Sequence, residues 1–129
     1  MILVVDDEIW YCIPLINVLQ AAGFATRQVT TPEECLKIVS SKENISLIIL
    51  DVMLPVGDLS MTETDLGRRT GLVLLKKIRE MRADIPIVIM SNASISFSQV
   101  ETPFTIFLRK RDASLDEILA LVERLTKSK

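Results

Sequence analysis

The chain has 129 residues, of which 49% are hydrophobic and 25% charged, a size and balance that fit one compact domain with its own core. Its formal net charge of −2 at pH 7 gives no support for nucleic-acid binding. The chain has no histidine, which excludes histidine-based metal sites and Ser-His or Cys-His catalysis.

The first part of the chain alternates apolar runs with helical patterns. Residues 2–5 form an apolar run that predicts a strand, and residues 10–22 follow with a helical pattern. Residues 25–29 predict a second strand. Thr31 then begins a helix to about residue 40, because it is a capping residue followed by proline and, three positions after the cap, by a glutamate.

The middle of the chain contains a third strand and a long connection. Residues 46–50 form a short run rich in β-branched residues, which predicts a strand, and residues 52–70 connect it to the next helix. Gly71 opens an amphipathic helix. The buried face of that helix is defined by Leu72, Leu74, Leu75 and Ile78.

Two more strands and a helix complete the pattern. Residues 87–90 and 105–109 predict the fourth and fifth strands. Ser114 begins the last helix with a second capping box, in which Glu117 is the third residue after the cap. Strands that alternate with helices predict an α/β fold with a parallel sheet and helices on both faces.

Polar residues follow the last residue of each of four strands. Because the carboxyl ends of parallel strands meet at one edge of the sheet, we expect these side chains to converge there. Acids so close repel each other by about 4 kcal/mol per pair at 4 Å and an effective dielectric near 20, so a bound divalent cation is the simplest relief. The converging residues are Asp6, Asp7, Asp51, Ser91 and Lys110.

Three local motifs resemble the response regulator receiver domain of two-component signalling. They are Val-Val-Asp-Asp-Glu at residues 4–8, Asp-Val-Met-Leu-Pro at residues 51–55 and Phe-Leu-Arg-Lys at residues 107–110. The resemblance covers nearly the whole chain and implies a single, stand-alone receiver domain over residues 1–129. It also implies a doubly wound, five-stranded parallel sheet in the order 2-1-3-4-5, the flavodoxin-like or CheY-like fold.

The resemblance assigns a role to each acid. Asp51 is expected to accept a phosphoryl group from a phosphohistidine, in a reaction that needs Mg²⁺. Asp7 and Asp51 are expected to bind the ion directly, Asp6 largely through water, and Met53 through its backbone carbonyl. The domain is therefore expected to be a signalling module and not an enzyme, apart from its own phosphorylation and dephosphorylation.

The remaining site residues are expected to bind the phosphoryl group and report on it. By resemblance, Lys110 and Ser91 bind phosphoryl oxygens, and Ser91 with Phe107 forms the switch that responds to phosphorylation. Phe107 could equally be an ordinary core residue, and each polar residue taken singly could be a turn acid, a loop hydroxyl or a surface charge. Their joint placement at strand ends favours the functional interpretation.

The expected partners are a sensor histidine kinase or phosphotransfer protein and an unknown downstream protein, with no nucleic acid and no membrane. The sequence shows neither a signal peptide nor an apolar run long enough to cross a bilayer, so we expect a cytoplasmic protein. Cys12 and Cys35 both lie in apolar helical patterns and are expected to be buried free thiols.

The chain departs from the family pattern in two segments. An insertion at about residues 56–70 follows the third strand, and either it folds over the pocket, with Arg68 or Arg69 near the phosphoryl group or a partner, or it is a surface insertion. Residues 93–104 are poor helix material, so we expect a fourth helix that is short, irregular or missing.

Two further departures lie next to site residues. Asn92 follows Ser91 where a small residue is usual, and Arg111 follows Lys110 where a proline, commonly after a cis bond, is usual. Either the Lys110–Arg111 bond is cis or the loop takes another path. A different alignment would move the lysine role to Arg111, although we favour Lys110.

Three other functions fit the sequence less well. A receiver-fold protein that is never phosphorylated could act as a constitutive binding module, which the unusual loops favour and the five retained site residues disfavour. A hydrolase of the haloacid dehalogenase type would need an acid two residues after its nucleophile, where this chain has Met53. A flavodoxin is disfavoured because Asp6 and Asp7 would repel the phosphate of its cofactor.

Overall fold

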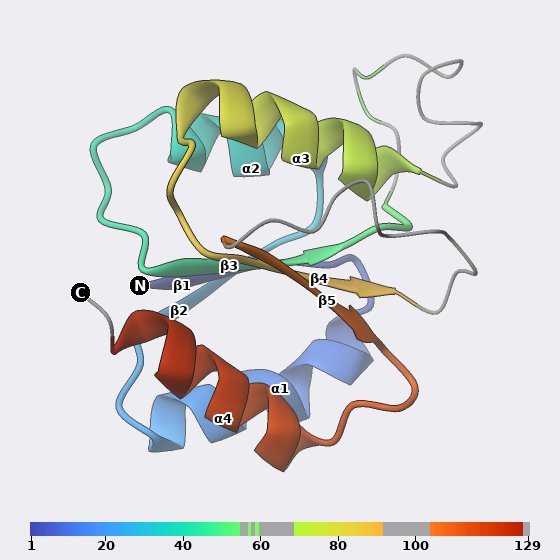
Figure 1. Cartoon of the computed structure of the whole chain (residues 1–129). Helices are drawn as coiled ribbons and strands as arrows, with labels where there is room; N and C mark the ends of the chain where they lie inside the picture. The colour runs from blue at the N-terminus through green and yellow to red at the C-terminus, as the bar shows by residue number, and fades with distance from the viewer. Residues whose placement is uncertain (55–56, 58, 60–68, 92–103, 128–129) are drawn as a thin grey trace.

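The computed structural model describes residues 1–54, 57, 59, 69–91 and 104–127. Strands and helices alternate along these residues, as the sequence predicts (Figure 1). In chain order they are β1 (Ile2–Val5), α1 (Ile9–Ala21), β2 (Thr26–Val29), α2 (Pro32–Val39), β3 (Leu47–Asp51), α3 (Thr70–Met81), β4 (Ile87–Ser91), β5 (Thr105–Arg109) and α4 (Leu115–Thr126).

The five strands form one parallel sheet in the order β2-β1-β3-β4-β5. Helices α2 and α3 cover one face of the sheet, and α1 and α4 cover the other (Figure 1). The doubly wound fold expected from the sequence is therefore confirmed. The register of the strands aligns their carboxyl ends: Val5 of β1 lies opposite Leu50 of β3, and Asp51 of β3 lies opposite Met90 of β4.

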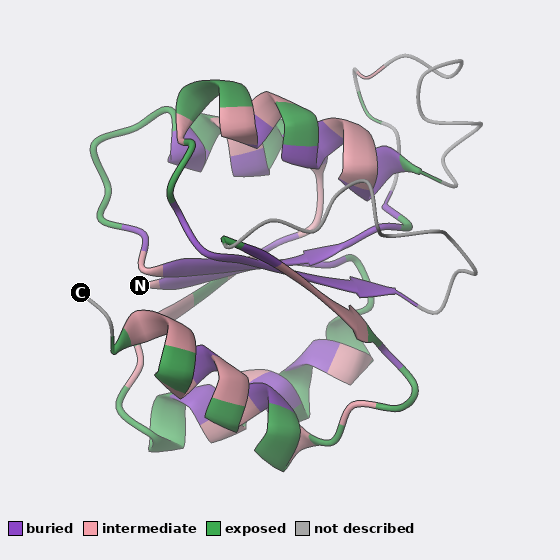
Figure 2. Ribbon diagram, viewed as in Figure 1, coloured by how far each residue is buried: buried purple, intermediate pink, exposed green. Residues whose placement is uncertain are grey.

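The three central strands are buried along their whole lengths, whereas each helix buries only the side that faces the sheet (Figure 2). Successive residues of a strand point to opposite faces. Leu3 and Val5 accordingly join the core beneath α2 and α3, while Ile2 and Val4 join the core beneath α1 and α4. This two-sided burial explains why the central strands are continuous apolar runs.

Both predicted helix N-caps are present. The Thr31 hydroxyl accepts a hydrogen bond from the amide of Glu34, and the Ser114 hydroxyl accepts one from the amide of Glu117. The strand ends differ slightly from the prediction, because Asp51 and Ser91 still pair with the neighbouring strand and so belong to β3 and β4.

Several expectations fall outside the described residues. These are most of the insertion at about 56–70, including Arg68, nearly all of the region at about 93–104, and Asn92. No cis peptide bond occurs in the described part of the chain, so the Lys110–Arg111 bond is trans and the loop takes another path. Among the same residues, no helix is both long and apolar enough to cross a membrane.

Candidate functional site

Four buried polar residues meet at the carboxyl edge of the sheet. Asp6 directly follows β1, and its amide donates to the carbonyl of Val29 in β2. Asp51 and Ser91 are the last residues of β3 and β4, and the amide of Lys110, just after β5, donates to the Ser91 carbonyl at 3.0 Å. Backbone hydrogen bonds between the strands, and between the residues that directly follow them, thus bring four buried side chains to one edge of the sheet. They are Asp6, Asp51, Ser91 and Lys110.

The Lys110 ammonium lies at the centre of this edge. Its Nζ donates to Asp6 Oδ2 at 2.8 Å and to Glu8 Oε1 at 2.6 Å, and it lies 3.5 Å from Asp51 Oδ2. The ring centroid of Tyr11, in the first turn of α1, is 4.3 Å from the same nitrogen, a cation–π distance. Lys110 is therefore a buried cation held between β1, β3 and α1, whereas Arg111 is exposed, which favours Lys110 in the lysine role.

Three carboxylates gather here, and one of them is not the one predicted. One oxygen each of Asp6, Glu8 and Asp51 lies within 4.8 Å of the others. Asp7, the expected direct ligand, is exposed and stands outside this group of described residues. The amide of Glu8 donates to Asp6 Oδ1 at 2.8 Å, a tight turn that places Glu8 beside the site. The only sequence signal for Glu8 is that it is the third acid of the Asp-Asp-Glu motif.

Burial sets the protonation of the central acid. Burial, followed by the charge of Asp6, raises the pKa of Asp51 to about 7, although Lys110 and the Met53 amide oppose the shift. Burial alone would lower the pKa of Lys110, but hydrogen bonds to Asp6 and Glu8 and the charge of Asp51 outweigh it, so this pKa is raised. Asp51 is thus less readily ionised than a surface carboxylate as long as no cation is bound.

The charges and donor atoms of the site fit a divalent cation. When all three acids are ionised, three carboxylates and one ammonium leave two uncompensated negative charges, and the carboxylates of Asp6 and Asp51 are buried. Hard cations such as Mg²⁺ prefer oxygen ligands of this kind. Met53 lies at the same place, since its amide donates to Asp51 Oδ1 at 3.3 Å.

The two expected switch residues lie on adjacent strands. Ser91, at the end of β4, is fully buried. Phe107 is in β5, opposite Ile89 of β4, and it is half-buried against the core beneath α2 and α3. This position suits either a core residue or an aromatic side chain that changes its burial.

Residues 2–102 match the family model for the response regulator receiver domain. The chain belongs to this family. The two-component response regulator ORR5 of Oryza sativa subsp. japonica is 30% identical over 97 residues, which cover 74% of this chain and 63% of the rice protein. The chain thus spans less than two thirds of that relative's length.

Solved structures show the same fold. The receiver domain of NtrX from Brucella abortus superposes with a TM-score of 0.78 at 24% identity, and the match covers both chains completely. A response regulator receiver protein from Sinorhizobium medicae gives a TM-score of 0.78 at 21% identity over 98% of this chain and 94% of that chain. Lys110 and Phe107 lie beyond the part of the receiver domain that matches the family model.

The helix after Asp51 begins in direct contact with the backbone of the site in this receiver domain. The Gly71 amide, at the start of α3, donates to the Val52 carbonyl at 2.7 Å. A Cβ atom at Gly71 would overlap the carbonyl oxygen of Asp51 and the Cα atom of Val52. Glycine is therefore required for α3 to pack against the backbone that carries Asp51.

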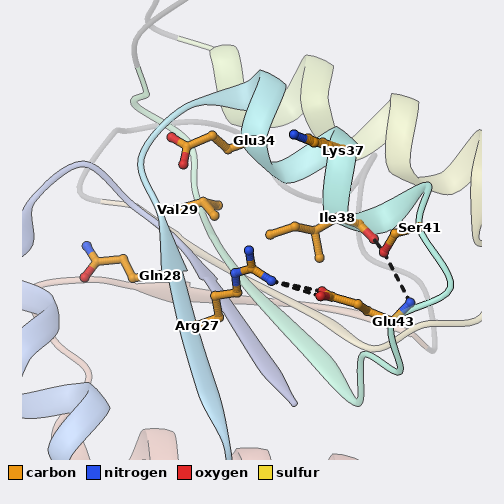
Figure 3. Close-up of a pocket in the computed structure, with 8 residues that line it drawn as sticks. All are labelled: Arg27, Gln28, Val29, Glu34, Lys37, Ile38, Ser41 and Glu43. Atoms are coloured by element: carbon orange, nitrogen blue, oxygen red, sulfur yellow. Dashed lines mark hydrogen bonds and ion pairs between the residues drawn. The ribbon is translucent and has the colours of Figure 1, made fainter.

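A separate hollow of about 280 Å³ lies at the β2 edge of the receiver domain, between β2 and α2 (Figure 3). Arg27 pairs with Glu43 at 3.0 Å on its wall. Hydrogen bonds link the hollow to Asp6: the side-chain amide of Gln28 donates to the Asp6 carbonyl at 3.0 Å, and the Val29 carbonyl accepts from the Asp6 amide at 3.1 Å. The lining residues are Arg27, Gln28, Val29, Glu34, Lys37, Ile38, Ser41 and Glu43.

The two cysteines are buried free thiols, as predicted. Burial raises the pKa of each to about 12, and the charge of Asp6 adds to the effect at Cys12. Both thiols therefore stay protonated at neutral pH.

Proposed function

We propose that this receiver domain accepts a phosphoryl group on Asp51 from the phosphohistidine of a sensor histidine kinase or phosphotransfer protein, in a reaction that depends on Mg²⁺. The observation that carries the proposal is the arrangement around Asp51. Its carboxylate is buried at the sheet edge beside a second carboxylate, Asp6, and a buried ammonium, Lys110. A structural ion pair needs only one of these acids, whereas phosphoryl transfer uses all three groups.

The transfer forms one bond and breaks one. An Asp51 carboxylate oxygen attacks phosphorus, the phosphorus–nitrogen bond of the phosphohistidine breaks, and the electron pair stays on the imidazole nitrogen. Such transfer is catalysed mainly by positioning and by neutralising charge on the phosphoryl oxygens. A bound Mg²⁺ supplies charge neutralisation at the acidic cluster.

Each residue of the site has a role in this proposal. Asp51 is the phosphoacceptor. With Asp7 it would bind the ion directly, while Asp6 would act through water and Met53 through its backbone carbonyl. Asp6 and Asp51 already lie together, whereas Asp7 is exposed and would have to turn inward to bind the ion. Lys110 donates to one phosphoryl oxygen.

The signal then passes along the sheet. Ser91 donates its hydroxyl to another phosphoryl oxygen, and Phe107, on the adjacent strand, changes its burial in response. The receiver relays the change by docking to a downstream protein. We place the reaction in the cytoplasm, where histidine kinases present their phosphohistidine.

Incubation with Mg²⁺ and acetyl phosphate, followed by intact mass, tests the proposal. We expect one added phosphoryl group in the wild type and none in Asp51→Ala. Asp84→Ala is the matched control, because Asp84 is an exposed aspartate just before β4, at the opposite edge of the sheet, and it should be phosphorylated normally. An unchanged wild-type mass would favour a constitutive binding module instead.

A further inference from the structure

The Lys110 ammonium uses all of its hydrogen-bonding capacity within the described site. A lysine has three N–H donors, and three carboxylates surround this one. The contact with Glu8 is the shortest at 2.6 Å, that with Asp6 is 2.8 Å, and that with Asp51 is the longest at 3.5 Å. The ammonium therefore lies toward Glu8 and Asp6 and away from the proposed phosphoacceptor.

We propose that Glu8 is a displaceable clasp on Lys110, which holds the ammonium away from Asp51 until a phosphoryl oxygen replaces the Glu8 carboxylate. The inference rests on the proposed function and adds a positioning residue to it. Glu8 touches neither the phosphorus atom nor Asp51 in this role. It acts through Lys110, by competing with the phosphoryl group for the same N–H donor.

Exposure identifies Glu8 as the partner that leaves. The Glu8 side chain is 59% exposed, whereas those of Asp6 and Asp51 are 7% and 4% exposed. Asp6 is also fixed by the hydrogen bond from the Glu8 amide to its Oδ1. A glutamate with a long, exposed side chain can turn into water and be solvated there, whereas a buried carboxylate that lost its partner would be left uncompensated.

Lys110, in contrast, stays in place during the exchange. Its side chain is only 3% exposed, and the Tyr11 ring lies 4.3 Å from its Nζ on the side of α1. The ammonium therefore changes partners by a small shift from Glu8 toward the phosphoryl group. When the phosphoryl group is lost, the Glu8 carboxylate returns and again balances the buried charge.

The clasp predicts that Glu8 weakens the binding of a phosphoryl group. Beryllofluoride, titrated at saturating Mg²⁺ and followed by calorimetry, is a suitable probe. Glu8→Gln keeps the size of the side chain but removes its charge, and we expect it to bind beryllofluoride about three- to tenfold more tightly than the wild type. Glu80→Gln, which removes an exposed charge from α3, is the matched control and should bind like the wild type.

The NMR signal of the Lys110 ammonium separates the clasp from a general charge effect. Without ligand, this signal should differ between wild type and Glu8→Gln, since Glu8 contacts Nζ directly. With beryllofluoride bound it should coincide in the two proteins, because Glu8 has then moved away. A difference that persists in the bound state would overturn the clasp.

Binding affinities for beryllofluoride and for Mg²⁺ also test the role of Glu8. Equal or weaker beryllofluoride binding by Glu8→Gln overturns the clasp and leaves the proposed function standing, provided that the wild type binds. A loss of affinity for Mg²⁺ alone in Glu8→Gln would make Glu8 a metal ligand and not a clasp. If neither wild type nor Glu80→Gln binds beryllofluoride, the proposed function fails and the clasp fails with it.

Discussion

Lys110 Nζ and Asp6 Oδ2 lie 2.8 Å apart, although the two residues are 104 positions apart in the sequence. This buried ion pair joins the ends of β5 and β1, which are not neighbours in the sheet. Between them lie β3 with Asp51 and β4 with Ser91, so the pair spans the proposed phosphoacceptor. The stability of the fold and the chemistry of the site therefore depend on the same side chains.

Replacing Lys110 should destabilise the receiver most strongly when no cation is present. Lys110→Met leaves Asp6 and Asp51 without their buried partner, and breaking such a pair costs on the order of 3 kcal/mol. A divalent cation can compensate for the lost ammonium. Urea unfolding should therefore show a larger loss in EDTA than in Mg²⁺, and equal losses in the two conditions would contradict the shared role of these charges.

The pH dependence of stability should reveal the protonation of Asp51. Its pKa is raised from 3.8 to about 7 by folding, so its contribution to stability is greatest below pH 4 and is lost as the pH rises through 7. Asp51→Asn abolishes this loss. We expect the difference in the free energy of unfolding between Asp51→Asn and the wild type, measured in EDTA, to be larger at pH 8 than at pH 5. The variant should gain on the order of 2 kcal/mol relative to the wild type over this range.

Lys110 does not disturb this comparison, because its raised pKa keeps the ammonium charged throughout that pH range. Asp84→Asn, at an exposed position, should show no such increase. A gain for Asp51→Asn that is the same at both pH values would mean that Asp51 is ionised as easily in the folded as in the unfolded chain.

A methyl group at Gly71 should damage the site as well as the fold. In Gly71→Ala the new Cβ meets the Asp51 carbonyl and must push α3 or the end of β3 aside, at a cost of about 1–3 kcal/mol. Calorimetry should show weaker Mg²⁺ binding. Gly23→Ala is the control, since Gly23 has φ of 97° but nothing near its Cβ position: it should lose about 1 kcal/mol and bind Mg²⁺ normally.

Lysine should not be able to replace Arg79, because the Arg79 guanidinium links the loop after α3 to the start of β5, at the edge of the sheet opposite the acidic site. Its guanidinium donates at once to carbonyls just after α3 and to acceptors at the start of β5, a fork that a lysine ammonium cannot reproduce. Thermal unfolding should show Arg79→Lys destabilised by about 2 kcal/mol, with exposed Arg111→Lys unchanged. The acceptors are the carbonyls of Arg82, Ala83, Ile85 and Phe104 and the Thr105 hydroxyl.

Most of the fold could be predicted because its signals are local. Continuous apolar runs gave the strands, and the caps at Thr31 and Ser114 gave two helix starts to the residue. The convergence of Asp6, Asp51, Ser91 and Lys110 followed from the geometry of parallel strands. These inferences need the order of residues along the chain and no knowledge of side-chain conformation.

The sequence could not predict which acids face inward after β1. Asp6, Asp7 and Glu8 are consecutive, and a turn closed by the hydrogen bond from the Glu8 amide to Asp6 decides that Glu8 and not Asp7 lies beside Lys110. Arg79 was equally hidden, because its acceptors are brought together only when α3, β4 and β5 pack. Contacts of this kind depend on tertiary structure and leave no periodic pattern in the sequence.

A crystal structure with Mg²⁺ and beryllofluoride tests the central claim most directly. We expect beryllofluoride to be bound to a carboxylate oxygen of Asp51, with the ion beside Asp6 and Asp51 and Lys110 Nζ in contact with a fluorine atom. An empty site, or beryllofluoride bound anywhere other than Asp51, would contradict it.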